Sequence, residues 1–291
     1  IMGTVGIQPV RANQVLVLLH PHPDRVFTNL AMNAVNAARS SYGLNCPRVI
    51  EMDRPLVMRP DYTGSERAAG SVEGFENLCY LLDKYRGEYD AIAIASVIST
   101  PLHYYSDYFW SGGDMVNPWG GVESMLTHTI SSMYDLPSAH APMLESQAVL
   151  DIETGVVDPR MAAEVISVSF LQCVLKGLQR SPRIIRDPEV MRDPGVLTAR
   201  DISCLVIPDG CLGLPTFAAL EQGIPVIAVR ENVNLMKNDL EALPWARGQL
   251  HIVDNYWEAA GVLSAIRTGI EPSAVRRPLR SILLEQTPTS Q

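Results

Sequence analysis

The stretch from residue 202 to residue 232 constrains the fold of this chain more than any other. It contains an apolar run, a turn with two glycines, a short helical pattern that ends at Gly223, and a second apolar run over residues 224–229. Strand, turn, helix and strand in this order predict a βαβ unit. Because ligands bind outside the carboxyl ends of parallel strands, the polar residues after the two runs mark a candidate site.

Apolar runs of strand length alternate with helical patterns along the rest of the chain. Uniformly apolar strands are typical of a parallel sheet that is covered on both faces. We therefore expect an α/β fold with a doubly wound, mainly parallel sheet of Rossmann-like βαβ units, and two lobes around a cleft as one arrangement. The expected strands span residues 14–19, 48–52, 89–98, 136–142 and 249–253, and the expected helices span residues 26–42, 72–85, 122–134, 159–179 and 256–269.

The expected lobes are an N-terminal α/β lobe over residues 1–180 and a C-terminal Rossmann-like lobe over residues 200–291, with a single domain as the alternative. Two segments lack a clear period. Residues 53–71 contain proline and glycine and are expected to be irregular. Residues 101–121 are aromatic and contain glycine, which favours a lid or an interface over a disordered linker.

The composition argues against several classes of partner. A net charge of -9, with basic residues clustered only near the C-terminus, argues against nucleic acid. Without an apolar run of about 20 residues or a signal peptide, no membrane partner is expected. Five scattered cysteines without a C-x-x-C pair fit reduced thiols and a cytoplasmic location.

Polar side chains follow both strands of the predicted βαβ unit. Cys211 lies in a turn before a helix, where the helix dipole favours a thiolate. It is either a nucleophile or acid–base thiol, or a small apolar residue packed under the turn. Asp209 and Glu231 are expected to lie side by side, where one carboxyl would hold a proton. Without a catalytic role, Asp209 would stabilise the turn through the backbone, and Glu231 would lie in a solvated loop.

An anionic part of the substrate would bind in the same region. Asn232 and the N–H groups near Gly213 and Thr216 suit a carboxylate or a phosphate. The turn has too few glycines and no lysine for a P-loop, and a dinucleotide fingerprint is absent. We therefore predict no nucleotide cofactor.

His140 is a second candidate for proton transfer, because it lies between alanines in an extended segment with no helical pattern to explain it. Glu123 and His128 in the preceding helix are candidates for substrate binding. Their separation of five residues places them on different faces of that helix. No cofactor is predicted, and a divalent metal is the alternative, since imidazoles suit transition metals. Its candidate ligands are His20, His22, His128 and His140.

Seven stretches form a second pattern along the chain. They are residues 6–13, 120–123 with 127–128, 138–142, 170–178 with 180 and 182, 209–213, 231–232 and 255–259. In this order they resemble the bacterial and plastid family known as domain of unknown function 3326. The resemblance implies a shared fold and a shared site, but no reaction. Family members carry a glycine-rich region before the stretch at residues 6–13, which is missing here, and an acidic strand end at the place of residues 20–24. The expectations are a shortened relative, or an upstream part that is unresolved, removed or supplied by a partner chain.

The strand, turn, helix and strand pattern over residues 202–229 is also similar to the second half of the aspartate/glutamate racemase superfamily. Those enzymes use two cysteines from two lobes. Here the corresponding strand at residues 91–98 leads into Ser99 and Thr100 and contains no cysteine. A decarboxylase or isomerase with one thiol is the remaining analogue.

Together these patterns predict an enzyme that acts on a small carboxylate-bearing metabolite. Its reaction would be proton transfer, as in an isomerase, lyase or decarboxylase, or amide hydrolysis. The predicted catalytic residues are Cys211, His140, Asp209 and Glu231. We expect a homo-oligomer. The alternative is a non-catalytic small-molecule-binding or assembly subunit that a partner chain completes.

Overall fold

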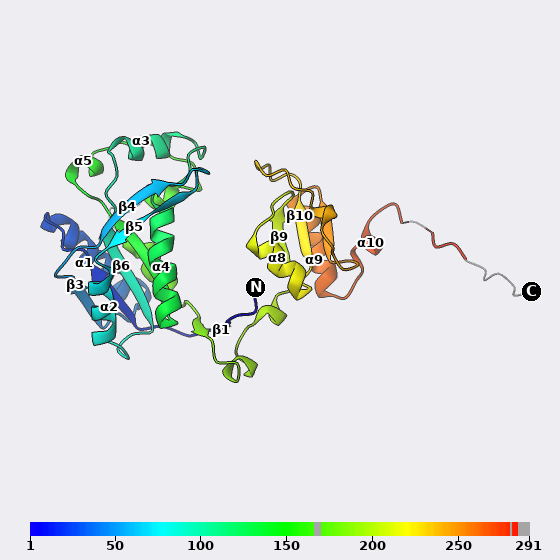
Figure 1. Cartoon of the computed structure of the whole chain (residues 1–291), viewed down its shortest axis with the longest axis horizontal. Coiled ribbons are helices and arrows are strands. Elements are labelled where there is room, and N and C mark those ends of the chain that lie inside the picture. The colour runs from blue at the N-terminus through cyan, green and yellow to red at the C-terminus, as the bar shows by residue number, and fades with distance from the viewer. Residues whose placement is uncertain (166–169, 280, 285–291) are drawn as a thin grey trace, which may run out of the picture. The chain divides into compact units, whose positions relative to one another are not determined.

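The computed structural model describes residues 1–165, 170–279 and 281–284 (Figure 1). The chain has a mixed α/β structure with two compact units: a large unit of residues 7–185, and a small unit of residues 1–6 and 186–291. Two short strands, β1 (Gly6–Gln8) and β8 (Arg183–Ile185), pair with each other where the chain passes from one unit to the other. Each unit is described below by itself.

The large unit is built on a parallel sheet with the strand order β3-β2-β6-β7. All of β2 and nearly all of β6 are buried, which confirms the strands predicted from the two most apolar runs. The strands are β2 (Val15–Leu19), β3 (Arg48–Glu51), β6 (Ala91–Val97) and β7 (Ser138–Met143). The helices of this unit are α1 (Arg25–Tyr42), α2 (Phe75–Lys84), α3 (His103–Trp110), α4 (Gly120–Tyr134), α5 (Gln147–Leu150), α6 (Ala162–Val165) and α7 (Leu171–Leu178).

Alternate residues of β2 face two separate hydrophobic cores, because successive side chains of a strand point to opposite faces of the sheet. Leu16 and Leu18 pack with residues of α2 and α4. Val15, Val17 and Leu19 pack with residues of α1 and α7. The sheet is therefore covered by helices on both faces, which explains why its central strands are uniformly apolar.

Local signals define the ends of α1. The Asp24 carboxylate accepts a hydrogen bond from the Val26 N–H at 2.9 Å and caps the first turn. Gly43 follows the last turn with a φ of 68°, a left-handed conformation that glycine adopts at little cost. The helix predicted for residues 26–42 is thereby confirmed.

An antiparallel hairpin occupies the segment that we expected to be irregular. Its strands are β4 (Val57–Tyr62) and β5 (Ala68–Glu73), and Pro60 lies opposite Gly70. Proline and glycine inside an apolar run are signals against a strand, and both occur here. The prediction for residues 53–71 was therefore wrong.

The aromatic segment at residues 101–121 contains a helix and a turn-rich stretch that leads into the next helix. It forms α3 and the start of α4. The ring centroid of Trp119 lies 4.9, 5.4 and 6.5 Å from those of Tyr105, Tyr108 and Phe109. These four rings pack in the core of the large unit, whereas Trp110 is exposed, and a lid or an interface stays a prediction.

The helix predicted for residues 159–179 is interrupted. α6 and α7 form parts of it, and residues 166–169 lie outside the described residues. Phe170, directly before α7, has a φ of 49°. A residue in the left-handed region cannot continue a right-handed helix, so the prediction of a single helix was wrong.

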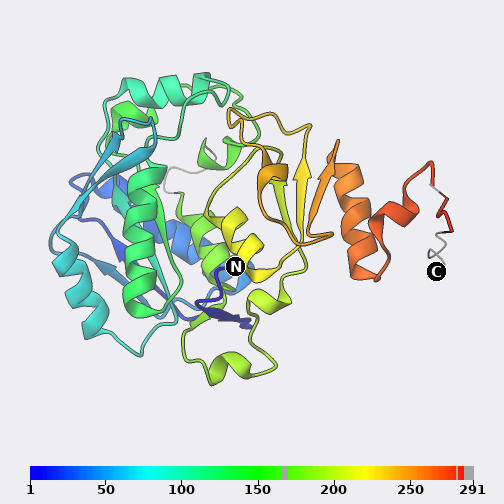
Figure 2. The ribbon, with the colours of Figure 1, turned by 45° about the vertical axis from the view of Figure 1, so that its right-hand side comes forward.

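The small unit contains a parallel sheet with the strand order β11-β10-β9, whose strands lie side by side in Figure 2. β9, α8 and β10 form the βαβ unit that the sequence predicted. Val226 of β10 packs on the side of α8, and Ile227 and Val229 pack on the side of α9. The elements are β9 (Leu205–Pro208), α8 (Leu214–Gln222), β10 (Val226–Val229), β11 (Leu250–Val253), α9 (Tyr256–Arg267) and α10 (Pro272–Val275), with 3-10 helices η1 (Val190–Arg192), η2 (Ala199–Asp201) and η3 (Leu240–Ala242).

The start of α4 lies directly against β5. A Cβ atom at Gly121 would lie 2.3 Å from the backbone carbonyl carbon of Ala68, a distance that real Cβ atoms do not show. Only glycine allows the helix to approach the strand this closely. A Cβ atom at the neighbouring Gly120 would come no closer than 3.7 Å to the side chain of Asn117. The close approach at Gly121 therefore fixes the turn of α4 that carries Glu123.

We expect Gly121→Ala to lower the free energy of unfolding by about 1–3 kcal/mol, because the added methyl group forces the backbone of α4 away from β5. Gly120→Ala is the matched control. Its methyl group has room, and alanine favours a helix by up to about 1 kcal/mol, so its stability should be unchanged or slightly higher. Urea unfolding of both variants measures the difference, and equal stabilities would contradict the packing at Gly121.

Candidate active site

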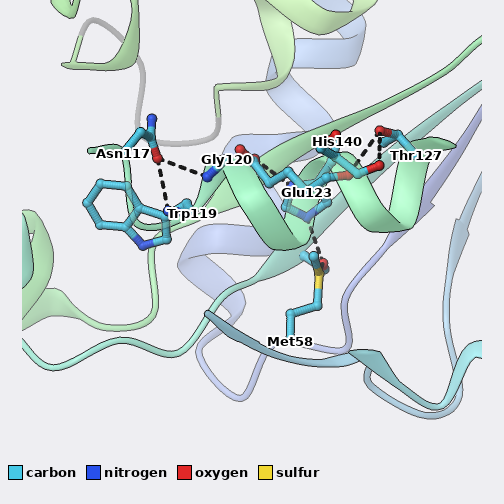
Figure 3. A network of polar contacts seen from close by, with 9 residues as sticks. Met58, Asn117, Trp119, Gly120, Glu123, Thr127 and His140 are labelled. Carbon is cyan, nitrogen blue, oxygen red and sulfur yellow. Dashed lines mark hydrogen bonds and ion pairs between the residues drawn. The ribbon is translucent and has the colours of Figure 1, made fainter. Parts of the chain in front are cut away.

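A buried chain of hydrogen bonds links β6, β7 and α4 (Figure 3). Ser96 Oγ lies 2.8 Å from His140 Nε2, and His140 Nδ1 lies 2.8 Å from Glu123 Oε1. Ser96 Oγ also lies 3.2 Å from Met58 Sδ. Ser96 is fully buried and the His140 side chain is 1% exposed, whereas the Glu123 side chain is 23% exposed. Of these three hydrogen-bonded side chains, Glu123 is thus the one that a bound molecule can reach.

The sheet register brings Ser96 and His140 together. β6 and β7 run parallel, with Ile94 opposite His140 and Ser96 opposite Pro142. Ile92 and Ile94 pack in the core that includes α4, so Ser96, two residues further along, points to the same face. Glu123 lies in the first turn of α4 and completes the chain from the helix side.

The start of α4 is held by a side chain outside the helix. Asn117 Oδ1 accepts hydrogen bonds from the N–H groups of Trp119 and Gly120, both at 2.9 Å (Figure 3). The first N–H groups of a helix have no partner within it, so this amide satisfies two of them. One turn further, the Thr127 hydroxyl donates to the carbonyl oxygen of Glu123 at 2.9 Å. These bonds hold the backbone that carries the Glu123 carboxylate.

The number of donors and acceptors on each side chain limits the protonation states that Ser96, His140 and Glu123 can adopt together. An ionised Glu123 can only accept, so His140 must carry a proton on Nδ1. Ser96 can then donate to Nε2 of a neutral imidazole. Alternatively, Ser96 accepts from the Nε2–H of an imidazolium and donates to Met58 Sδ. His140 can therefore gain or lose a proton while both of its ring nitrogens keep a hydrogen bond.

Glu123 lines a cavity of about 350 Å³ in the large unit. Ile98, Met143 and Leu144 also line it, which places it at the carboxyl ends of β6 and β7. Most of its remaining wall is apolar or aromatic. Cavities of this size, with apolar walls and a few polar groups, are the usual form of small-molecule sites.

A second carboxyl group, Glu164 of α6, lines the same cavity. Tyr108 Oη donates to Glu164 Oε1 at 3.3 Å, and Asn117 Nδ2 donates to Tyr108 Oη at 3.2 Å. Burial, and to a lesser extent the charge of Glu123, raises the pKa of Glu164 above its usual range, although the bond from Tyr108 opposes this shift. Burial and the charge of Glu164 raise the pKa of Tyr108 to about 12, so the phenol remains a donor.

The predicted site residues divide between the two units. His140 and Glu123 come together in the large unit, where His128 is exposed on α4. The predicted residues of the small unit are Asp209, Cys211, Gly213, Thr216, Glu231 and Asn232.

Each carboxylate at the edge of the small sheet has a partner of its own. Asp209 Oδ2 lies 3.8 Å from Nε of Arg230, which also pairs with Asp254. Glu231 accepts a hydrogen bond from the Tyr256 N–H at 2.7 Å, at the start of α9. Asp209 and Glu231 thus contact different groups, and a catalytic role for them stays a prediction. Asn232 Nδ2 donates to the Tyr256 hydroxyl at 2.5 Å.

Cys211 is half-buried in the turn between β9 and α8. Its N–H donates to the Pro208 carbonyl at 3.2 Å, and the Thr216 hydroxyl donates to its carbonyl at 3.2 Å. Gly213 is the N-cap residue of α8. The hydroxyl of Thr216 thus stabilises the turn, and a catalytic role for Cys211 stays a prediction.

Of the four histidines proposed as metal ligands, His22 and His140 are hydrogen-bonded to other groups of the protein, whereas the buried Nδ1 of His20 has no partner among the described residues. The Asp24 N–H donates to His22 Nδ1 at 3.0 Å, so His22 Nε2 carries the proton and donates to the Leu144 carbonyl at 3.1 Å. Within the described part of the chain, no three or more His, Cys, Asp or Glu side chains are grouped to hold a metal ion. A bound divalent metal stays a prediction.

Ser96, Glu164 and Asn117 were missed by the sequence analysis. Ser96 had a usable signal, because it is the polar residue in an otherwise apolar strand and lies on the same row as Ile94. Glu164 lies in the helix predicted for residues 159–179 and Asn117 in the aromatic segment, and no spacing connects either of them with Glu123 in the sequence.

The tautomer of His140 provides a direct check of the hydrogen-bond chain. We expect ¹⁵N chemical shifts to show a protonated Nδ1 in the wild-type protein, and a loss of that preference in Glu123→Leu, where the acceptor is gone. His22 is an internal control with the opposite tautomer, protonated on Nε2, in both proteins. A wild-type His140 protonated on Nε2 alone would contradict the bond to Glu123.

His20 makes stability depend on pH. Burial, with a contribution from His22, lowers the pKa of His20 from 6.5 to about 4. Between these values the unfolded chain binds a proton that the folded chain does not bind, so stability is lost as the pH falls from 6.5 toward 4. We expect His20→Gln to reduce this loss in urea unfolding, and His128→Gln, at an exposed site, to retain it. An unchanged pH dependence in His20→Gln would show that other groups cause it.

The family and the relative that match this chain are described without a reaction. A family model described as "Protein of unknown function (DUF3326)" matches residues 1–276. An uncharacterized lipoprotein of Synechococcus sp. is 27% identical over 278 residues, which cover 94% of this chain and 74% of the relative. No solved structure matches the chain.

These similarities correct one prediction and confirm another. The relative is named a lipoprotein, which contradicts the cytoplasmic location inferred from the scattered cysteines, so that prediction was wrong. Among the described residues, no helix is long and apolar enough to cross a bilayer. The matched range contains the seven stretches that carried the resemblance, and it confirms the family. The chain belongs to the family of proteins of unknown function described as DUF3326.

Proposed function

We propose that this protein is an enzyme that transfers a proton on a small molecule bound in the cavity of the large unit. The chain of hydrogen bonds from Ser96 through His140 to Glu123 is the observation that carries the proposal. A carboxylate that is oriented by a buried imidazole and exposed to a cavity is suited to general acid–base catalysis. Isomerase, lyase and decarboxylase reactions all require such a step.

The residues of the site take different roles in this proposal. Glu123 is the catalytic base, because it is the member of the chain that lines the cavity. His140 and Ser96 are positioning residues that fix the direction of the carboxylate. Glu164 is suited to the role of acid, since burial raises its pKa. A second carboxyl group whose pKa is raised by burial supports a division of the site into base and acid.

Serine hydrolysis has less support. The contacts run from serine to histidine to glutamate, as they do in a hydrolase triad. A nucleophile must reach its substrate, however, and Ser96 is fully buried within β6. Of these three residues, Glu123 is the one that lines the cavity. We therefore assign Ser96 to the support of His140.

A non-catalytic small-molecule-binding protein is the second candidate. The mostly apolar wall of the cavity favours it, since such a wall binds an apolar ligand without any reaction.

Two further proposals concern the location of the protein and its fold class. The name of the relative supports a place at a membrane surface for this chain as well. Helices on both faces of the parallel sheet support the doubly wound class.

Deuterium uptake tests the proposal without knowledge of the reaction. The full chain is incubated in deuterium oxide with a library of small metabolites, and mass spectrometry detects compounds that gain deuterium at carbon. We expect at least one compound to exchange with the wild-type protein. In Glu123→Gln the rate should fall by about 10²–10⁴-fold, because the base is lost.

Glu76→Gln is the matched control, since Glu76 lies in the first turn of α2 as Glu123 lies in the first turn of α4. It should exchange at the wild-type rate. Thermal stabilisation of the protein identifies the compounds in the library that bind. If those compounds gain no more deuterium with the protein than without it, proton transfer is refuted and the non-catalytic candidate stands.

A further inference from the structure

The charged groups of the cavity have one sign. Glu123 and Glu164 line it, and no lysine or arginine is found among the described residues of its wall. His140 offsets the charge of Glu123 only when its ring is protonated. A carboxylate-bearing ligand, which the sequence led us to expect, would meet two carboxyl groups and no basic side chain. Like charges at close range in a poorly solvated site repel each other strongly.

The rest of the wall is suited to a cation. Tyr105, Phe109, Trp119 and Phe170 line the cavity with aromatic rings. The faces of such rings carry partial negative charge and attract ammonium groups. A neutral ligand could fill the same space, but it would remove water from both carboxyl groups and supply no counter-charge.

Trp119 gives a second, independent sign that a polar molecule belongs here. Its side chain lines the cavity and the residue is 7% exposed. The indole Nε1–H is buried and has no hydrogen-bond partner in the described part of the chain. Buried donors are almost always paired, so this one indicates a missing acceptor, such as a water bound with the ligand or an acceptor atom on the body of the ligand.

We propose that the ligand of this cavity is an organic cation, an amine or ammonium group on an apolar body, with its charge beside Glu123 and Glu164. The location rests on the proposed function, and the inference adds the substrate class. The apolar body contacts the aromatic rings, while the cationic group replaces the water that both carboxyl groups lose.

Three probes with the same phenyl group and different charges test this inference. They are 2-phenylethylamine, 2-phenylethanol and 3-phenylpropanoate, and isothermal titration calorimetry measures their binding to the full chain. We expect the amine to bind at least about tenfold more tightly than the alcohol, since a bond between charged groups contributes that much, and the propanoate to bind most weakly. Equal or weaker binding of the amine, or no binding of any probe, would overturn the inference.

Binding of the three probes to variants of the two carboxyl groups shows where the charge of the amine lies. Glu164→Gln and Glu123→Gln should each weaken binding of the amine by about tenfold or more and change binding of the alcohol by less than about threefold. Binding of the alcohol thus reports that the cavity remains folded in each variant. Glu76→Gln should bind all three probes as the wild type does. Loss of the amine preference in Glu76→Gln, or its retention in both cavity variants, would place the cation elsewhere and refute the inference.

The two proposals can fail separately. A preference for the amine in a protein that exchanges no deuterium would leave the cationic ligand in place and refute proton transfer. Deuterium exchange on neutral or anionic compounds, with no preference for the amine, would support proton transfer and refute the cationic ligand.

Discussion

The hydrogen bond between His140 and Glu123 joins the central sheet of the large unit to the helix that covers it. A buried imidazole destabilises a fold unless both of its nitrogens find partners. Here Ser96 supplies one partner and Glu123 the other. That requirement constrains three elements at once: the register of β6 and β7, the position of α4, and the glycine contact at Gly121 that lets α4 approach β5. Ser96 and His140 are buried by this arrangement, whereas the carboxylate of Glu123 remains partly exposed.

The cavity follows from the same arrangement. α3 and the start of α4 place aromatic rings against the carboxyl ends of β6 and β7, and α6 adds Glu164 opposite an apolar wall. The carboxyl groups therefore stand in a poorly solvated space, where charge is costly unless it is balanced. His140 donates a hydrogen bond to Glu123 from the buried side. A cationic ligand would balance the charge of Glu123 and Glu164 from the cavity side. The proposed acid–base chemistry and the proposed ligand class therefore depend on the same two carboxyl groups.

The sequence indicated those features that depend on local pattern. The buried strands β2 and β6 and the βαβ unit of the small sheet were evident from apolar period and turn residues. His140 stood out because no pattern explained it. The hairpin was missed because Pro60 and Gly70 argue against strands, and α3 because its apolar residues were attributed to a lid. The link from Ser96 to Glu123 depends on sheet register and helix placement, which no spacing along the chain encodes.

A crystal structure of the full chain soaked with 2-phenylethylamine tests this account most directly. The account predicts the amine nitrogen within about 2.7–3.2 Å of carboxyl oxygens of Glu123 and Glu164, and the bonds from Ser96 to His140 and from His140 to Glu123 intact. A structure in which side chains fill the cavity, or in which His140 lies beyond hydrogen-bond distance of Glu123, would contradict it.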